Sequence, residues 1–146
     1  MRFIETMPLG LDEAAEVSRT AWVPSHETRA RIEAALGPLS PLAPTRASDE
    51  ARNFRFAHGA GVVGFISPVS EPYCGSCNRL RLTADGQLHL CLLNEDQRDL
   101  RGLLRGGAGP EAIERALTAA VLAKPMGHHL AEGLSIRSRA MFQIGG

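Results

Sequence analysis

Cys74, Cys77 and Cys91 are the only cysteines of the chain, and they lie within one short stretch. Cys74 and Cys77 form a C-x2-C pair, in which the close spacing and Gly75 allow both sulfurs to point at one centre. Cys91 follows after thirteen intervening residues, which is about the length of a hairpin out and back. Soft thiolates gathered in this way suit an iron–sulfur cluster or zinc, and the spacing alone does not separate the two.

The residues between Cys77 and Cys91 predict a hairpin with a defined register. Asp85-Gly86 is a turn signal, and a three-residue loop over 84–86 would place Gly86 at a left-handed bulge position. This register gathers four leucines on one face, namely Leu80, Leu82, Leu88 and Leu90. The other face then carries Arg79, Arg81, Thr83, Gln87, His89 and Cys91. A two-residue loop would mix leucine with arginine and histidine on both faces, so the bulged register is the better prediction.

The same register predicts an anion site, because it places Arg79 and Arg81 beside Cys91 on the face without leucines. Guanidinium groups are forked donors that suit a phosphate or the edge of a purine. The alternative is a solvated strand face, which is common for arginine. The position of both arginines a few residues after Cys77 favours the functional interpretation.

A structural zinc site has four closed ligands, so the zinc interpretation needs a side chain besides the three thiols. His89, on the same predicted face as Cys91, is the first candidate. The other histidines considered are His58, His128 and His129. A cluster with three protein ligands instead leaves one iron open to a substrate atom, much as catalytic zinc keeps an open position. The count of three cysteines therefore favours iron, and free thiols or a disulfide are a further alternative.

Length and composition describe one ordinary soluble domain of 146 residues, 44% hydrophobic and 22% charged. The net charge of zero argues against nucleic acid as a general partner. No run approaches the ~18 apolar residues that span a bilayer, so no membrane segment is expected. An odd, clustered set of cysteines is unlike a secreted disulfide framework, which favours a reducing cytoplasm.

The rest of the chain predicts a mixture of strands and helices. The expected strands are residues 2–7, 53–56 and 61–66, and the last two form a hairpin. The expected helices are 25–36, 99–105 and 110–124, with Ser25 as the first N-cap and Gly37-Pro38 as its stop. The buried side of the last helix is expected to carry Ile113, Ala116, Leu117, Ala120 and Val121. The remaining segments are a loop or short helix over 10–22, a proline-rich linker over 37–50 and an irregular tail over 141–146.

Residues 65–86, FISPVSEPYCGSCNRLRLTADG, strongly resemble the C-terminal cluster motif of the GTP 3′,8-cyclase family. These are radical S-adenosylmethionine (SAM) enzymes of molybdenum cofactor biosynthesis. The resemblance continues through Asp99-Leu100-Arg101, Lys124-Pro125-Met126-Gly127-His128 and Ile144-Gly145-Gly146. It reaches back to Arg2 through Gly10, while Leu11 to Ala60 is only loosely similar. Tyr73, His89-Leu90 and Phe142 depart from the family's pattern.

The resemblance implies an α+β fold. Residues 1–50 would hold the last strand and helix of a partial radical SAM barrel with a linker. Residues 51–146 would form a hairpin-rich cluster-binding domain with C-terminal helices. The terminal Gly145 and Gly146 are similar to a tail that inserts towards the active site.

The resemblance also implies roles for particular residues. Cys74, Cys77 and Cys91 would hold a 4Fe–4S cluster whose open iron binds the guanine of GTP, and Arg79 and Arg81 would help to hold the nucleotide. In the opening segment, Arg2 would contact GTP and Met7 would contact SAM.

The implied reaction begins with reductive cleavage of SAM at a different, N-terminal 4Fe–4S cluster. The 5′-deoxyadenosyl radical takes hydrogen from C3′ of the GTP ribose, which then attacks C8 to give 3′,8-cyclo-7,8-dihydro-GTP.

The family's N-terminal C-x3-C-x2-C motif is absent from the chain. The expectation is therefore a truncated gene, a fragment or a split subunit. It would need the missing radical SAM portion, or a partner chain that supplies it, and would bind a cluster and GTP without turnover when alone. A homodimer is a further candidate assembly. The rival hypothesis is a zinc-stapled binding module without chemistry.

Overall fold

The computed structural model describes residues 1–10, 13–128, 130 and 141–144. The chain forms two compact units, one of Met1–Met7 with Val17–Asn78 and one of Pro8–Glu16 with Arg79–Gly146. Each contains strands and helices, so the predicted α+β class is confirmed. The two units are divided at other positions than residue 50. The division into domains at residue 50 stays a prediction. The assignment of the opening strand to a partial barrel also stays a prediction.

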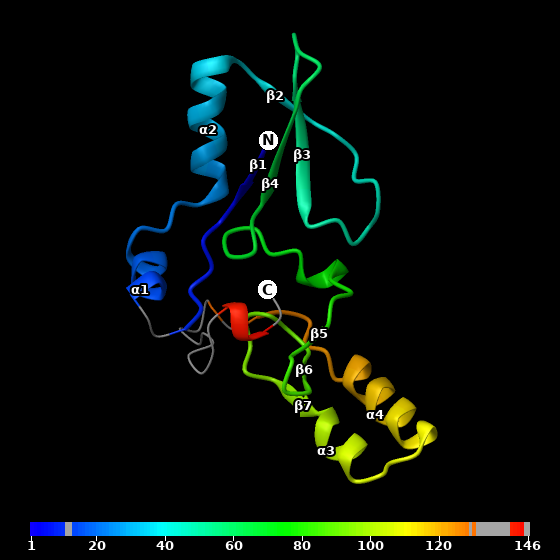
Figure 1. Cartoon of the computed structure of the whole chain (residues 1–146). Coiled ribbons are helices and arrows are strands. Elements are labelled where there is room, and N and C mark those ends of the chain that lie inside the picture. Colours follow the sequence, from blue (N-terminus) through cyan, green and yellow to red (C-terminus); the bar gives the residue numbers. More distant parts are fainter. Residues whose placement is uncertain (11–12, 129, 131–140, 145–146) are drawn as a thin grey trace. The chain divides into compact units, whose positions relative to one another are not determined.

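The first unit is built on a four-stranded sheet in the order β1-β4-β3-β2 (Figure 1). Its strands are β1 (Arg2–Ile4), β2 (Leu39–Pro41), β3 (Ala51–Phe56) and β4 (Val62–Ile66). β1 runs parallel to β4, whereas the other neighbours are antiparallel. The hairpin β3–β4 confirms its prediction. β2 falls in the segment predicted as a linker, because three residues that end in proline carry no alternation to reveal a strand.

Two helices precede this sheet's second strand. α1 (Glu13–Thr20) lies within the segment predicted as a loop or short helix. α2 (Ser25–Leu36) has the predicted bounds and ends at Gly37, whose φ of +96° favours glycine.

α2 covers one face of the sheet, and aromatic side chains fill the space between them. Phe3, Phe54 and Phe65 share this face, because side chains alternate along a strand and are in register between strands. Phe3 stacks on Phe65 with ring centroids 5.6 Å apart, and Phe54 meets Phe65 edge-on at 5.7 Å. From α2, Ile32 packs against this cluster and the Arg29 guanidinium lies 5.2 Å from the centroid of the Phe54 ring.

The second unit contains a three-stranded antiparallel sheet in the order β5-β6-β7. Its strands are β5 (Arg81–Leu82), β6 (Gln87–His89) and β7 (Gln97–Asp99). Arg81 pairs with His89 and Leu82 with Leu88, which confirms the predicted bulged register. β7 was not predicted, because its three residues are all polar and exposed.

Two helices complete this unit, α3 (Leu100–Arg105) and α4 (Pro110–Leu122), both close to their predicted bounds. The Asp99 carboxylate caps α3 by accepting from the Gly102 N–H at 3.0 Å. The helices bury the leucine face of the hairpin in a cluster of Leu88, Leu90, Leu100 and Ala120, with Leu80 and Ala116 packed against it. Leu82, the fourth leucine of the predicted face, is 58% exposed, so the core does not extend to the hairpin tip.

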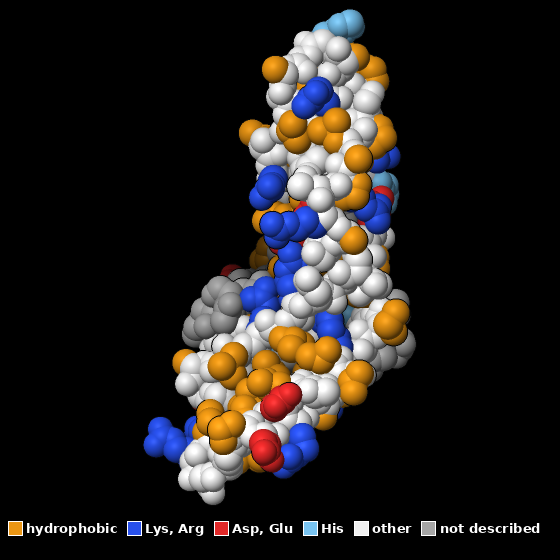
Figure 2. All heavy atoms as spheres, turned by 90° about the vertical axis from the view of Figure 1, so that its right-hand side faces the viewer, with side chains coloured by type: hydrophobic (Ala, Val, Ile, Leu, Met, Phe, Trp, Pro, Cys, Tyr) orange, Lys and Arg blue, Asp and Glu red, His pale blue; other side chains and the backbone are white. Residues whose placement is uncertain are grey.

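Apolar side chains also remain on the surface of this helical pair, as the orange spheres in the lower part of Figure 2 show. Leu104, Val121 and Leu122 are exposed. Of the five residues predicted to form the buried side of α4, only Ala120 is fully buried, and Leu117 and Val121 are exposed. The predicted stripe therefore has the right helical period but is wider than the face that packs.

The tip of the hairpin is fixed by Gly86 against the start of α3. Gly86 has φ +81°, as the bulged register requires, and its carbonyl accepts from the N–H groups of Leu100 and Arg101 at 3.0 and 3.2 Å. A Cβ added at Gly86 would lie 2.6 Å from the Arg101 Cβ. Both the backbone conformation and the close approach therefore require glycine.

Replacing Gly86 by alanine should lower the free energy of unfolding by about 2–4 kcal/mol, because backbone strain and a steric clash add together. Gly107→Ala is a matched control, since Gly107 has a similar φ of +76° but would meet nothing within 4 Å. It should lose only the backbone part, about 1–2 kcal/mol. Urea unfolding followed by far-ultraviolet circular dichroism measures both. Equal losses in the two variants would contradict the close approach at Gly86.

Candidate metal and nucleotide site

The C-x2-C pair lies in the first unit, where Cys74 opens a short 3-10 helix, η1 (Cys74–Ser76), and Cys77 directly follows it. The Cys77 N–H donates to the Cys74 carbonyl at 3.1 Å, which fixes the turn between the two thiols. Both thiols are free and half-buried. A Cβ added at Gly75 would meet nothing within 4 Å, and Gly75 is not in the left-handed region. The packing of the chain itself therefore does not require glycine there, and the space beside the turn is open.

The segment that leads into this turn is fastened by Glu5, a residue for which the sequence predicted no role. Glu5 follows β1 and is only 4% exposed. Its carboxylate accepts from the N–H groups of Val69 and Ser70, at 3.0 and 2.9 Å, and from the Ser70 hydroxyl. It also accepts from the Ser25 N–H at 2.7 Å. One carboxylate therefore joins the end of β1, the start of α2 and the segment before Cys74.

The same contact corrects the predicted cap of α2. Ser25 was expected to be the N-cap, but Pro24 occupies that position and no side chain from it caps the helix. The Glu5 carboxylate satisfies the Ser25 N–H instead, from twenty residues away. A negative charge at the first turn also complements the helix dipole.

These bonds determine the ionisation of Glu5. Burial alone would raise the pKa of this carboxyl, but the hydrogen bonds from Ser70, Ser25 and Val69 outweigh burial. The pKa of Glu5 therefore lies below its usual value, because the charged form is the one that accepts. A second anchor is the ion pair between Arg52 of β3 and Glu71, three residues before Cys74.

Cys91 lies in the second unit, two residues after β6 ends, and is also free and half-buried. Its sulfur accepts from the Leu93 N–H at 3.4 Å. A backbone donor to sulfur stabilises the thiolate, and hydrogen bonds of this kind tune the sulfurs of metal centres. Its environment thus suits a metal-binding thiolate.

Arg79 and Arg81 belong to the same unit as Cys91, and both are half-buried. Arg81 opens β5 opposite His89, as predicted. The face that they share is less open than the sequence suggested, because Thr83 and His89 are buried, His89 to 2% exposure. The Thr83 hydroxyl accepts from the Gln87 N–H at 2.9 Å and belongs to the hairpin turn.

The histidines considered for zinc have different surroundings. His89 is buried in β6, and His58 is exposed in the turn between β3 and β4. The His128 ring accepts from the Leu130 N–H at 3.4 Å, and His129 lies outside the described residues. Within each unit, the described residues contain no group of three His, Cys, Asp or Glu side chains that could hold a metal. The set of Cys74, Cys77 and Cys91 takes two members from the first unit and one from the second, and it stays a prediction.

Arg2 lies on the face of the first sheet opposite α2, in line with Gly64 and Asn53. A Cβ at Gly64 would approach the Asn53 Oδ1 to 2.8 Å and the Arg2 Cγ to 3.3 Å, so glycine makes room for both side chains. They line an open pocket of about 280 Å³, together with Thr45 and neighbouring residues. Arg2 is therefore exposed to a space that a ligand can enter.

The remaining predicted residues lie near the ends of described segments. Met7 is half-buried and ends the first part of the first unit. Gly145 and Gly146 lie outside the described residues, whereas Ile144, directly before them, is fully buried in η3 (Met141–Ile144). No helix in the described ranges is long and apolar enough to cross a membrane.

Replacing Glu5 by glutamine should lower the stability of the metal-free chain by about 1–3 kcal/mol at neutral pH, because an amide cannot accept from all four donors. The wild type should lose this advantage as pH falls. Since the pKa of Glu5 is lowered by folding, its contribution is complete above the unfolded value of about 4.3 and disappears as pH falls through the folded value.

The fluorescence of Trp22, the only tryptophan and a member of the first unit, follows unfolding in urea across this pH range. Glu27→Gln is the control, because Glu27 makes an exposed pair with Arg31 and should matter by less than about 0.5 kcal/mol. A Glu5→Gln variant with the same pH profile as the wild type would exclude the buried carboxylate as an anchor.

Comparison with known proteins gives a consistent set of relatives. The family described as Molybdenum Cofactor Synthesis C matches residues 1–130. A GTP 3′,8-cyclase of Moorella thermoacetica is 44% identical over 146 residues, which are 100% of this chain and 44% of the relative. The GTP 3′,8-cyclases of Pelotomaculum thermopropionicum and Heliobacterium modesticaldum are 43% and 42% identical, again over 100% of this chain and 44% of each relative. The chain thus spans less than half the length of these relatives.

Proposed function

The chain belongs to the Molybdenum Cofactor Synthesis C family, and from this premise we propose that it is the substrate-holding, C-terminal part of a GTP 3′,8-cyclase. The resemblance of its motifs to the GTP 3′,8-cyclase family is thereby confirmed. In the proposed function the chain binds a 4Fe–4S cluster and GTP, for conversion of GTP to 3′,8-cyclo-7,8-dihydro-GTP in molybdenum cofactor biosynthesis. The observation that carries the proposal is a set of three free thiols in the matched region, with no fourth cysteine.

Cys74, Cys77 and Cys91 would hold the cluster. Their chemistry fits, because all are free thiols, the C-x2-C turn is fixed by its own backbone, and the Cys91 sulfur accepts from a backbone N–H. When bound by three thiolates, a 4Fe–4S cluster supplies one iron that can take a ligand atom from the substrate.

Arg79 and Arg81 would hold the nucleotide. These half-buried residues, two positions apart with Arg81 as the first residue of β5, carry guanidinium groups suited to the several negative charges of a triphosphate or to the edge of the base. Arg2 is proposed as a further contact to GTP, since it lines an open pocket of the first unit. The contribution of these residues is binding and orientation, which lowers the entropic part of a reaction barrier.

The radical-generating steps are assigned to residues outside this chain, because the relatives are more than twice as long and the chain has no second cysteine motif. Such an N-terminal radical SAM portion would bind most of the SAM, with Met7 as a contact from this chain. The opening strand and α2 would complete a partial barrel, and Gly145 and Gly146 would reach towards the substrate. The proposed location is the cytoplasm. A homodimer remains a candidate assembly.

Anaerobic reconstitution with iron and sulfide should give a brown protein with about four iron and four sulfide per chain. Serine variants of Cys74, Cys77 and Cys91 should each lose most of this iron. A colourless protein with one zinc, whose affinity for zinc depends on His89, would instead support the rival zinc-stapled module and would refute the cluster. The measurements are iron, sulfide and zinc content with the ultraviolet–visible spectrum.

Replacing Arg79 or Arg81 by alanine should weaken GTP binding about ten- to hundredfold, because a charge-assisted hydrogen bond contributes about 1.5–3 kcal/mol. Iron content should stay unchanged. Arg98→Ala is the control, since Arg98 is exposed on β7 of the same sheet and bonds the neighbouring Gln97 carbonyl. Equilibrium binding of GTP to the reconstituted chain measures the effect. If iron content fell in parallel with GTP binding, the two arginines would be structural.

A further inference from the structure

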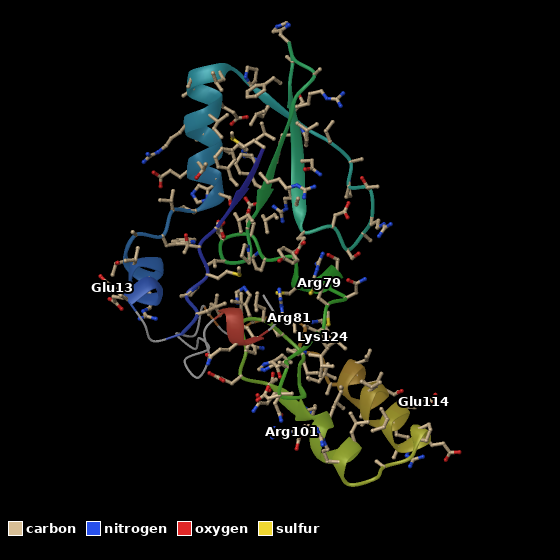
Figure 3. The ribbon with its side chains drawn as sticks, viewed as in Figure 1. Glu13, Arg79, Arg81, Arg101, Glu114 and Lys124 are labelled. Carbon is tan, nitrogen blue, oxygen red and sulfur yellow. The ribbon has the colours of Figure 1, made fainter. Side chains whose placement is uncertain are left out.

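Lys124 is the only lysine among the sixteen lysine and arginine residues of the chain. It lies two residues after the end of α4, where the chain passes the hairpin. Its Nζ donates to two backbone carbonyls, that of Arg79 at 2.9 Å and that of Leu90 at 2.6 Å. Figure 3 labels Lys124 and Arg79, with Arg81 near them in the view.

These two carbonyls lie on opposite arms of the hairpin. The described β5–β6 ladder ends at the pair of Arg81 and His89, so Arg79 and Leu90 lie just beyond its open end. The Leu90 carbonyl belongs to the peptide group that continues into Cys91. One ammonium group therefore connects the backbone of a proposed GTP-binding arginine to the backbone of a proposed cluster ligand.

The chain is fixed on both sides of Lys124, by α4 before it and by a hydrogen bond to Gly127 after it. The Asn94 side chain is buried, and its amide donates to the Gly127 carbonyl at 3.3 Å. The Leu90 N–H also donates to the Asp96 carbonyl at 3.3 Å, which ties down the chain on either side of Cys91. At the opposite end of the hairpin, Gly86 is bonded to α3.

The chemistry of lysine suits this position. An ammonium group is a compact charge with three donors in a tetrahedral arrangement, so it can serve two carbonyls that approach from different directions. A guanidinium group is a planar fork that fits two acceptors in one plane, such as those of a carboxylate. Both bonds are charge-assisted and therefore stronger than those between neutral groups.

We propose that Lys124 is a positioning residue, which sets the spacing between Arg79 and Cys91 and so places the arginine pair against the nucleotide. It acts through the two carbonyls and touches neither the cluster nor GTP. This inference rests on the proposed function, because it requires that Arg79 binds GTP and that Cys91 binds the cluster.

The test compares Lys124→Met, Lys124→Arg and the wild type, each as the full chain reconstituted anaerobically with iron and sulfide. Arg115→Met is the matched control, because it removes one positive charge from an exposed position on α4. The measurements are iron content, the dissociation constant for GTP and the electron paramagnetic resonance spectrum of the reduced cluster with and without GTP. Amide hydrogen exchange of the metal-free chain reports the hairpin directly.

Lys124→Met should keep most of its iron, bind GTP roughly ten- to hundredfold more weakly, and lose the wild-type change in the spectrum on adding GTP. Its amide at Leu90, which donates to the Asp96 carbonyl, should exchange faster, while those of Thr83 and Gly86 at the hairpin tip stay protected. Lys124→Arg keeps the positive charge. Its hairpin amides should be protected from exchange nearly as in the wild type, whereas its GTP affinity should remain weaker. Arg115→Met should behave as the wild type.

Wild-type GTP affinity in a Lys124→Met chain that carries iron would overturn the positioning role, and faster exchange there would mark Lys124 as a structural contact only. A wild-type chain that takes up zinc and does not bind GTP would refute the proposed function and the positioning role together. If Lys124→Met does not fold, wild-type GTP affinity and spectrum in Lys124→Arg would overturn the proposal, since that variant cannot keep both bonds in their geometry.

Discussion

The first unit depends on the buried carboxylate of Glu5. It accepts hydrogen bonds from the start of α2 and from Val69 and Ser70 in the segment before the C-x2-C turn. Four donors around one buried charge replace the water that the carboxylate loses, and they offset the desolvation cost of burying it. The consequence for the site is that the position of the C-x2-C turn is restrained. The turn with Cys74 and Cys77 leaves the sheet from a fixed point rather than from a free loop.

In the second unit, the segment that carries the proposed site residues is also held in place, but by a different set of contacts. Its short hairpin has few ladder bonds of its own, and helical segments hold it at both ends. Gly86 receives two N–H groups from α3 at the tip, and Lys124 donates to both arms at the opposite end. Between them the leucine face packs on α3 and α4. Arg81 thus lies on, and Arg79 and Cys91 directly beside, a strand pair whose position is set by contacts from other segments.

Local sequence signals predicted much of the secondary structure and the register of the hairpin. Leucine alternation and the Asp85-Gly86 turn gave the correct hairpin register, and Gly37 marked the end of α2. Contacts between distant residues could not be predicted. A glutamate after a strand, such as Glu5, looks like any exposed acid, and only the fold brings Ser70 to it. The same holds for Lys124, whose role depends on carbonyls that carry no side-chain signature. The three thiols were found from spacing alone, and their common ligand remains a proposal.

The difference between the two glycine turns of the second unit has a practical consequence for engineering. The loop at 84–86 resembles a convenient insertion point, because Ala84 and Asp85 are exposed and the turn is short. The third residue of this loop, Gly86, however, is half-buried, lies close to Arg101 and is bonded to α3. Gly107, between α3 and α4, meets nothing around it. A fluorescent label or an affinity tag would therefore be tolerated in the connection between the helices, and would displace β5 and β6 from α3 if placed in the hairpin.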